Sequence, residues 1–386
     1  MTMEFTHETL GQRVLFGTGQ AAENVASELA LLGATQAMVI AAPPERTLAE
    51  AVTASIVPAL LWDEVVQHVP ADVALRAREA AAENDIDVIL SVGGGSTTGL
   101  AKAVALATGI PIVAVPTTYA GSEATNVWGL TEDRTKRTGV DGRVLPRTVV
   151  YDADLSKTLP VGLSIASGLN GLAHCIDSLW APRTDPINQA LALEGARALN
   201  VALRGIVVDP DDIAAREQAL YGCYLAAVSF ASAGSGLHHK ICHVLGGTFD
   251  LPHAQTHATV LPYVLAFNAP SIPELAGRLA AALSHTARTD GKDSLNVSPD
   301  GRSGAYASSG PAMALEALRD LYAEIDAPLQ LADYGFTLAD IPEAAERIVA
   351  ATPASNPVPV DVEDISTLLA NALNGSIPAI TAPVAL

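Results

Sequence analysis

Three consecutive glycines, Gly93, Gly94 and Gly95, follow a mostly apolar segment at residues 86–92 and precede Ser96. The apolar segment predicts a buried strand, and a helical pattern begins just beyond the serine. Glycines in such a turn let a phosphate approach the backbone, where N–H groups at a helix start bind its charge. This order of strand, glycine turn and helix predicts a nucleotide-binding layer. A tight turn without a ligand is the alternative, because the GxGxxG spacing is missing.

The first 160 residues repeat this alternation of short apolar runs and helical segments. Such alternation is typical of a parallel sheet with helices on its faces. We expect strands or strand-like loops at residues 13–19, 36–42, 62–69, 86–92, 110–116, 128–138 and 144–151. We expect helices at residues 22–32, 51–61, 73–84 and from residue 98 onward.

Beyond residue 161 the strand pattern disappears, and Ala- and Leu-rich segments show helical periodicity. We expect helices at residues 168–180, 187–203, 214–233, 237–245, 262–267, 274–282, 312–325, 341–349 and 361–372. Residues 284–310 are rich in Ser, Gly and Asp, which favours an exposed, mobile loop. The predicted fold class is an α/β nucleotide-binding domain at residues 1–160 and an all-helical domain at residues 161–386, joined by a hinge at residues 152–159.

Five of the nine histidines lie in one short segment, residues 237–258: His238, His239, His243, His253 and His257. Such a cluster is unusual on a protein surface, whereas a metal site or a proton-transfer site requires several imidazoles close together. His239 and His243 are four residues apart, so on a helix they share a face. We expect the glycine pair at residues 246–247 to end that helix and Pro252 to fix the approach to His253.

A second segment adds two polar side chains. Asn170 and His174 are four residues apart among small and apolar neighbours, which favours a buried helix with both groups on one face. Together with His239 and His253 they predict four groups around one centre. For each histidine, a hydrogen-bonded core position is the alternative, and His238 and His257 are expected behind the centre.

Composition excludes several classes of protein. The chain has 386 residues, with 49% hydrophobic and 17% charged residues and a net charge of −20. A nucleic-acid partner is not expected, because it would need a basic surface. Three cysteines without a CxxC pair predict no disulfide framework. No apolar run reaches the length of a membrane span, and the polar N-terminus lacks a signal-peptide core, so we expect a cytoplasmic protein.

The two histidine segments resemble those of the iron-containing (group III) alcohol dehydrogenase family, and within it they are most similar to maleylacetate reductases. The family has an Asp-x-x-x-His pair, a His-x-x-x-His segment, and a Pro-His ten residues further on. Here these motifs are Asn170 to His174, His239 to His243, and Pro252-His253. Asn170 is a departure, because metal-binding members have Asp there. The resemblance implies a dehydroquinate synthase-like fold and a homodimer.

The resemblance also implies cofactor-binding loops. The glycine turn at residues 93–96 matches the family's Gly-Gly-Gly-Ser loop, although Gly99 stands where Asp is usual. Lys102 lies on the following helix. Thr117, Thr118 and Ser122 match the Pro-Thr-Thr loop that lies along the cofactor phosphates and nicotinamide ribose.

Ala41 ends the predicted strand at residues 36–42, where nicotinamide-binding folds often place a carboxylate. The first carboxylate after it is Glu45. A carboxylate at the strand end would repel the 2′-phosphate of NADPH. Because none stands there, we expect either NADH or NADPH as the cofactor.

The function implied by the resemblance is NAD(P)H-dependent reduction of maleylacetate to 3-oxoadipate, a step in the degradation of aromatic compounds. We expect His243 to lie nearest the nicotinamide and to donate or relay a proton, and Lys240 to bind a carboxylate of the small anionic substrate. His174, His239 and His253 would hold substrate oxygens. No metal is expected to be required, because Asn170 is neutral. If a metal binds, the same three histidines would hold it.

Two other classes of function fit the same motifs. One is a metal-dependent alcohol dehydrogenase or aldehyde reductase of the same fold, against which the neutral Asn170 argues. The other is a dehydroquinate synthase-like lyase or a non-catalytic nucleotide-binding protein. A lyase would consume no net NADH, so a cofactor-oxidation assay separates it from a reductase.

Overall fold

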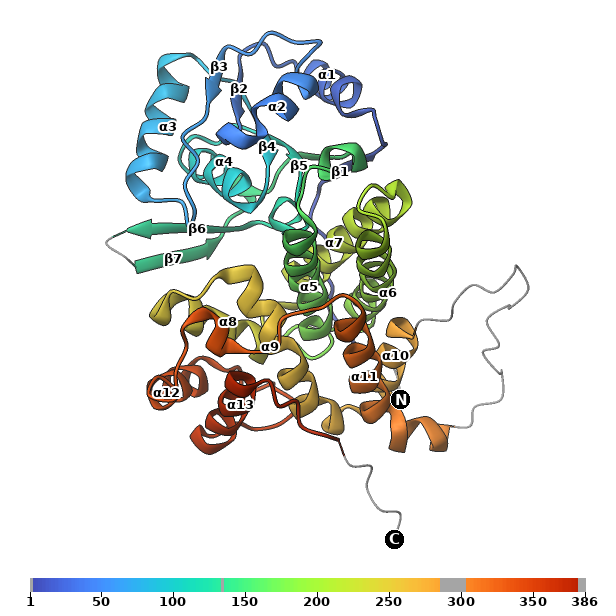
Figure 1. Cartoon of the computed structure of the whole chain (residues 1–386). Coiled ribbons are helices and arrows are strands. Elements are labelled where there is room, and N and C mark those ends of the chain that lie inside the picture. The colour runs from blue at the N-terminus through green and yellow to red at the C-terminus, as the bar shows by residue number, and fades with distance from the viewer. Residues whose placement is uncertain (1–2, 133–134, 285–302, 381–386) are drawn as a thin grey trace, which may run out of the picture.

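The computed structural model describes residues 3–132, 135–284 and 303–380. A sheet-containing half is built from the first part of the chain, and the second part is helical (Figure 1). The last strand of the sheet ends at Tyr151, and the first long helix of the second half begins at Val161. Sequence analysis correctly predicted this combination of an α/β half and a helical half.

Six parallel strands form the main sheet, in the order β1-β8-β5-β4-β2-β3. They are β1 (Arg13–Phe16), β2 (Ala37–Ile40), β3 (Leu60–Trp62), β4 (Val88–Gly93), β5 (Ile112–Pro116) and β8 (Thr148–Tyr151). The strands β2, β4, β5 and β8 are buried throughout, which explains their predominantly apolar sequences. The chain order reverses between β2 and β4, and ligands of such sheets bind beyond the carboxyl ends of the strands at this kind of point.

Helices cover both faces of the sheet. One face packs against α1 (Ala21–Leu32) and α2 (Arg46–Val52), and the other packs against α3 (Ala71–Glu83) and α4 (Gly95–Thr108). Neighbouring strand residues point to opposite faces. Met38 accordingly belongs to the α3–α4 core, whereas Val39 belongs to the α1–α2 core.

Two predictions for this half were wrong. Residues 51–61 are not a helix, because α2 already ends at Val52 and the chain enters β3 at Leu60. Thr53 closes α2, and its hydroxyl donates to the carbonyl of Ala49 at 2.7 Å. Residues 128–138 are not one strand but parts of a hairpin, β6 (Val127–Glu132) and β7 (Thr135–Val140). Polar and apolar residues mix throughout this segment, so the pattern does not mark where the chain reverses.

Nine α-helices form the described second half. They are α5 (Val161–Ser178), α6 (Pro186–Val208), α7 (Ile213–Ala233), α8 (Leu237–Phe249), α9 (His253–Asn268), α10 (Pro273–Leu283), α11 (Ser303–Glu324), α12 (Ile341–Ala351) and α13 (Val362–Asn374). Short 3-10 turns lie in both halves of the chain, at Pro43–Glu45, Ser122–Ala124, Gly142–Val144, Ala153–Ser156, Ala269–Ser271 and Leu331–Tyr334. Asp185 caps α6, and its carboxylate accepts the N–H groups of Ile187 and Asn188.

Helix α5 is the centre of the helical half, because it packs against α6, α7 and α9. Leu169, Leu172 and Ile176 on this helix are completely buried. The small residues Gly168 and Gly171 face Leu203 and Leu199 of α6, which lets the two helices approach closely. A helix so enclosed holds its polar side chains in fixed positions.

Several boundaries in the helical half differ from the predictions, and three of the differences are informative. Helix α8 continues through Gly246 and Gly247 to Phe249, so the glycine pair does not end it. Helix α9 begins at His253 and includes Pro262, so it starts nine residues before the predicted helix. The structure describes only part of the predicted loop at residues 284–310. Residues 285–302 lie outside the described residues, and α11 begins at Ser303.

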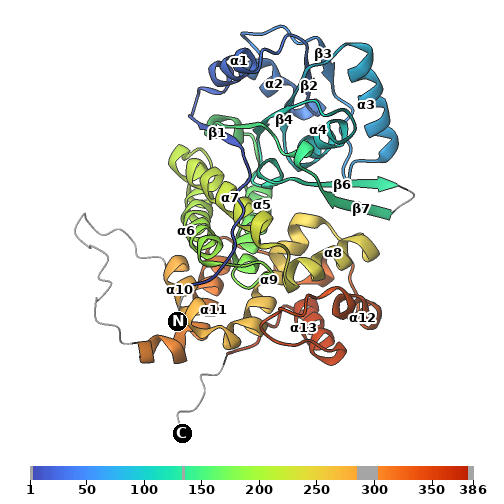
Figure 2. The same cartoon turned by 180° about the vertical axis from the view of Figure 1, so that it is seen from behind.

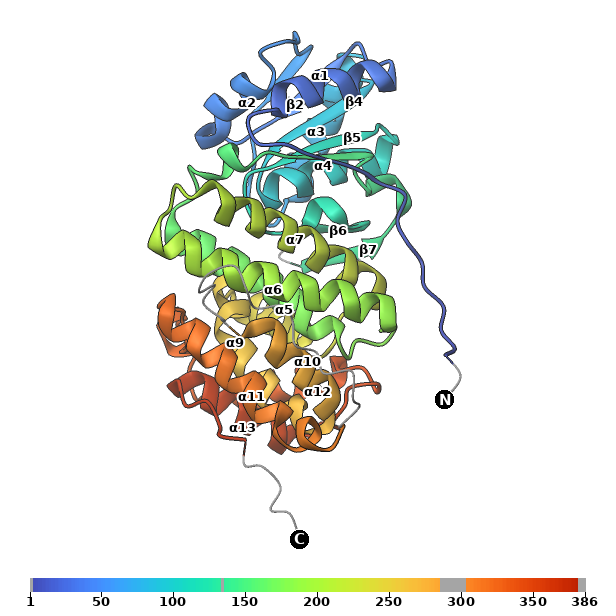
Figure 3. The same ribbon diagram turned by 90° about the vertical axis from the view of Figure 1, so that its right-hand side faces the viewer.

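The N-terminal arm runs from the sheet along the helical half, as Figures 2 and 3 show from two sides. His7 Nδ1 lies 2.8 Å from the carboxylate of Asp185 at the start of α6. Gln12 donates to the carbonyls of Glu123 and Pro146 in the sheet half. The arm therefore contacts both halves.

No single helix among the described segments is long and apolar enough to cross a bilayer. Helices α7 and α8 reach the required length and composition only as a pair, across a bend of 97°.

Candidate active site

The glycine turn joins two loops at the carboxyl edge of the sheet. Gly93 ends β4 with φ of +151°, and a Cβ atom there would lie 2.5 Å from Oγ1 of Thr97, so the position requires glycine. The carbonyl of Gly93 accepts the N–H of Thr117, which follows β5. Helix α4 begins at Gly95, three residues before the predicted start, so Gly94 is its N-cap and Gly95 and Ser96 lie in its first turn. This is the arrangement that binds phosphate groups, and the predicted cofactor contacts stay predictions.

Glu45 reaches this turn, which sequence analysis did not foresee. Ala41 follows β2 and is buried, as a residue at the end of a central strand should be. The 3-10 turn Pro43–Glu45 then brings the Glu45 carboxylate to the N–H groups of Gly94 and Ala42. Burial raises the pKa of Glu45, and these two N–H groups counteract the rise. A carboxylate therefore stands beside the glycine turn, although none occupies the strand end itself.

Lys102 occupies a different environment from the one predicted. Its side chain is buried, and the ammonium donates to the carbonyls of Ser122, Thr125 and Val127 at 2.6–2.9 Å. Burial lowers the pKa of Lys102 to about 7, and nearby Glu123 counteracts this effect. We therefore interpret Lys102 as a residue that holds the loop after β5 rather than one that binds the cofactor directly.

Helix α5 connects this loop to the histidines. The N–H of Tyr119, two residues after Thr117, donates to Oγ of Ser167 at 3.1 Å. Asn170 and His174 follow Ser167 on the same helix face, at spacings of three and four residues. Seven residues of α-helix span about 10 Å. One rigid face thus runs from the predicted nucleotide loop to the histidine cluster.

Asp177 continues this face and is the functional residue that sequence analysis missed. It is completely buried, and its carboxylate accepts N–H groups from Gly236 at 2.7 Å, from His238 at 3.3 Å and from the Trp180 indole at 3.0 Å. A Cβ atom at Gly236 would lie 2.5 Å from the carboxylate, so glycine is needed for this approach. The negative charge stands at the start of α8, where a helix stabilises anions. Its spacing of three residues from His174 was the available signal.

Asp177 also orients the first site histidine. Nδ1 of His239 lies 2.8 Å from the Asp177 carboxylate. Because this carboxylate already accepts other N–H groups, we assign the proton to Nδ1, which leaves a lone pair on Nε2. Burial raises the pKa of Asp177, whereas His238 and the backbone N–H groups lower it.

The structure brings His174 and His239 together. Their rings stack with centroids 4.9 Å apart, and Phe230 of α7 covers both at 4.7 and 4.2 Å. His243 lies one turn further along α8, is exposed, and has its ring 6.0 Å from that of His239. Lys240 lies on the same helix and is half-buried. Phe230 was not predicted, and no motif near it in the sequence identifies it.

His253 lies at the edge of the cluster and His257 lies inside it. His253 is the first residue of α9, is exposed, and has its ring 4.5 Å from that of His257. His257 is completely buried, with its ring 4.9 Å from His239 and 6.5 Å from His174. His257 is therefore an inner member of the cluster, and His253 lies at its exposed edge.

Burial keeps the inner imidazoles neutral. It lowers the pKa of His174 to about 4 and lowers the pKa values of His238, His239 and His257 well below the ordinary value. At neutral pH these groups donate and accept hydrogen bonds without carrying charge.

The predicted metal ligands include no negatively charged group. Asn170 Oδ1, His174 Nδ1 and His239 Nε2 are buried and have no hydrogen-bond partner among the described residues, but none carries a negative charge. Within the part of the chain that the structure describes, His174, His239 and His253 do not form a group whose donor atoms lie within 4.8 Å of one another. These unpartnered atoms are available to a ligand, either the polar atoms of a small substrate or a metal ion.

Comparison with known proteins decides the family. Residues 11–153 match the model described as iron-containing alcohol dehydrogenase, and residues 164–373 match the C-terminal model of the same family. The chain belongs to the iron-containing alcohol dehydrogenase family. The resemblance seen in the histidine segments is thereby confirmed over most of the chain.

Individual members of the family align over nearly the whole length. A maleylacetate reductase of Sphingobium indicum is 43% identical over 382 residues, which cover 98% of this chain and 100% of that protein. The crystal structure of an iron-containing alcohol dehydrogenase from Corynebacterium glutamicum is 55% identical, with a TM-score of 0.88 and coverage of 97% and 98%. That of a maleylacetate reductase from a Rhizobium species is 39% identical, with a TM-score of 0.86 and coverage of 98% and 100%.

Proposed function

We propose that the protein catalyses the NAD(P)H-dependent reduction of maleylacetate to 3-oxoadipate. The observation that carries the proposal is the polar face of α5. Its Ser167 binds the loop after β5, and its His174 stacks on His239 of α8. A dinucleotide on the glycine turn would reach the histidines along this face. The full-length similarity to maleylacetate reductases supports the same reaction.

The chemistry requires few groups from the protein. A bound NAD(P)H would supply hydride to the carbon beta to the ketone, and the protein's own residues would then stabilise the resulting enolate and give a proton to the adjacent carbon. The enolate shares its charge between carbon and oxygen, so it needs a hydrogen-bond donor more than a strong Lewis acid. Neutral imidazoles can supply such donors without the cost of burying a cation.

Exposed groups at the edge of the cluster suit the proton and the substrate carboxylates. His243 and His253 are both exposed, whereas His174 is half-buried and His239 is completely buried. We assign proton donation to His243 and contact with a substrate carboxylate to His253 and Lys240. These cations or donors would offset a net charge of −20, which otherwise repels a small dianion.

We further propose that turnover does not depend on a metal. Asn170 supplies a neutral amide where metal-binding members have a carboxylate. The family otherwise includes metal-dependent alcohol dehydrogenases, so this point separates the two candidate activities.

The deciding experiment follows NADH and NADPH oxidation with maleylacetate, before and after treatment with a strong chelator. Rapid turnover that survives the chelator supports both the reaction and its independence of a metal. Turnover that is lost on chelation and restored by iron or zinc would keep the reaction but reject a metal-free site. No turnover in any condition would reject the reaction, and alcohols would then be tested in the oxidation direction.

A role in aromatic-compound degradation, a cytoplasmic location and a homodimer belong to the same proposal. The location would be checked by cell fractionation and the dimer by light scattering of the purified protein.

A further inference from the structure

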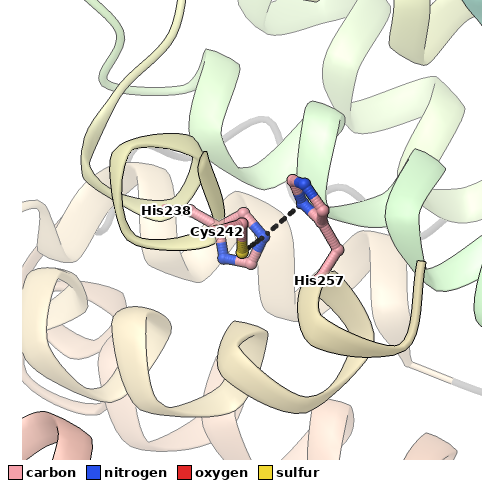
Figure 4. Close-up of side chains that lie close together, drawn as sticks. All are labelled: His238, Cys242 and His257. Carbon is pink, nitrogen blue, oxygen red and sulfur yellow. Dashed lines mark hydrogen bonds between the residues drawn. The ribbon is translucent and has the colours of Figure 1, made fainter. Parts of the chain in front are cut away.

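A second group of side chains lies behind the site histidines. His238 and Cys242 are four residues apart on α8 and share a face, and His257 of α9 points toward them (Figure 4). Nε2 of His238 lies 3.0 Å from Nδ1 of His257 and 3.6 Å from Sγ of Cys242. One donor atom from each residue lies within 4.8 Å of the other two. All three side chains are buried, with at most 2% exposure.

We propose that His238, Cys242 and His257 form a binding site for Zn²⁺. Two imidazoles and one thiolate are a ligand set that zinc favours. Ligand distances of about 2.0 Å for nitrogen and about 2.3 Å for sulfur separate tetrahedral donors by about 3.3–3.6 Å. The His238–Cys242 separation of 3.6 Å agrees with these values, and the His238–His257 separation of 3.0 Å is slightly shorter, so the two rings would move apart by a few tenths of an ångström to admit the ion. A fourth position stays open for water or a small anion.

Charge favours this group over the Asn170 group. A Cys242 thiolate supplies the negative charge that Asn170, His174 and His239 lack. Beyond the effect of burial, the Asp177 carboxylate acts to raise the pKa values of both Cys242 and His238, so it lies near enough to supply a second negative charge to a bound dication, although it disfavours the free thiolate. One dication thus meets two anions, which reduces the cost of burying it.

The binding of Zn²⁺ to these three residues releases one proton. The Cys242 thiol loses its proton to solvent when Zn²⁺ binds. The proton between His238 and His257 moves to the outer nitrogen of its own ring, so both imidazoles stay neutral. His238 Nδ1 and His257 Nε2 are those outer nitrogens, and neither has a hydrogen-bond partner in the described structure. No oxidant or reductant takes part.

The site is distinct from the family's metal position. It shares no residue with Asn170, His174, His239 or His253, and it contains a sulfur ligand. Because the group is fully buried, we expect slow entry that depends on local opening of α8 and α9.

Cobalt is a suitable probe, because Co²⁺ occupies zinc sites and reports a thiolate ligand by absorption. The full-length protein is stripped with a chelator, dialysed and incubated with Co²⁺ until absorption is constant. We expect one equivalent of bound cobalt and an intense thiolate-to-cobalt charge-transfer band in the near ultraviolet. Added Zn²⁺ should remove the band, and zinc should raise the melting temperature of the apoprotein.

Matched cysteine variants locate the site. Cys242→Ala should lose the band, whereas Cys175→Ala, which removes another buried thiol outside the group, should keep it. His257→Asn should weaken cobalt binding at least tenfold and serves as the second test if Cys242→Ala does not fold.

Three results would overturn the proposal. The first is the absence of the band after prolonged incubation with Co²⁺, together with the absence of bound zinc in protein from zinc-supplemented cells. The second is a band that persists in Cys242→Ala. The third is cobalt that binds without a sulfur band and is lost in His174→Gln, which would place the ion at the Asn170 group instead. None of these readouts depends on reductase activity.

Discussion

Asp177 shows how one buried carboxylate can serve two purposes. It accepts N–H groups at the start of α8, and it holds Nδ1 of His239 so that Nε2 points away from the carboxylate. The first purpose stabilises the helix, and the second fixes the tautomer of a site histidine.

Replacement of this carboxylate tests both purposes. We expect Asp177→Asn to lower kcat by about 10- to 100-fold, because the amide no longer fixes the His239 tautomer. The free energy of unfolding should fall by about 3 kcal/mol, since buried N–H groups lose a charged acceptor. Steady-state kinetics at a temperature where circular dichroism shows the folded state would measure the first effect, and urea unfolding the second.

Asp185→Asn is the matched control. Asp185 is also buried and also caps a helix, but it lies at the start of α6 beside His7. Asparagine remains a good helix cap, so we expect little change in kcat. Equal losses of kcat in the two variants would show that Asp177 acts only on stability.

His243 is the group to which we assign proton donation. We expect His243→Asn to lower kcat with maleylacetate about 100-fold or more, with a smaller change in the KM for NADH. The control is His68→Asn, an exposed histidine outside the cluster whose positive φ asparagine tolerates. If kcat of His243→Asn stays within a few-fold of the original value, His253 becomes the better candidate.

Residue spacing explains which site residues could be predicted. Asn170 and His174 share a helix face, and His239 and His243 share another, so sequence periodicity alone predicts each pair. Asp177 lies three residues after His174 and therefore on the same helix face, but the prediction did not include it. The position of His257 inside the cluster and of His253 at its edge depends on how α9 packs against α8, and spacing carries no information about that.

At the scale of elements, the turn after β4 has a backbone geometry that requires glycine at Gly93. We expect Gly93→Ala to raise the KM for NADH at least tenfold, because φ of +151° and the close Thr97 hydroxyl force the loop to move. Gly142→Ala is the control, since a Cβ atom there meets nothing within 4 Å. Initial rates at varied NADH would measure both, and a similar KM in Gly93→Ala would remove the turn from the cofactor site.

Element types were more predictable than their ends. Central strands and long helices follow from apolar runs and periodicity, because burial enforces those patterns. Helix α8 passes through Gly246 and Gly247 because packing on α9 and α12 outweighs the low helix propensity of glycine. The Glu45 contact with Gly94 joins segments about 50 residues apart in the sequence, and no local pattern reports such a contact.

At the scale of the whole molecule, the buried histidines make stability depend on pH. The pKa of His174 is about 4 in the folded protein and 6.5 as its ordinary value. Below pH 6.5 the unfolded chain therefore binds more protons, so stability falls as pH drops toward 4. We expect His174 alone to cost about 2 kcal/mol between pH 7 and pH 5.

The measurement compares the original protein with His174→Gln by urea unfolding at the two pH values. The variant should lose about 2 kcal/mol less than the original over this range, whatever its absolute stability. Identical losses would mean that His174 has an ordinary pKa in the folded protein and is more hydrated than its burial indicates.

The polar face of α5 fixes the rotation of this helix about its axis relative to both halves of the molecule. Ser167 is fixed by the loop after β5, and His174 is fixed by the histidine cluster, with seven helical residues between them. Insertion of one residue in this interval would turn His174 by about 100° away from His239, whereas most surface loops tolerate such a change. Recombination between relatives should therefore succeed when the crossover falls before Val161 or after Ser178, and fail when a length change falls inside the helix.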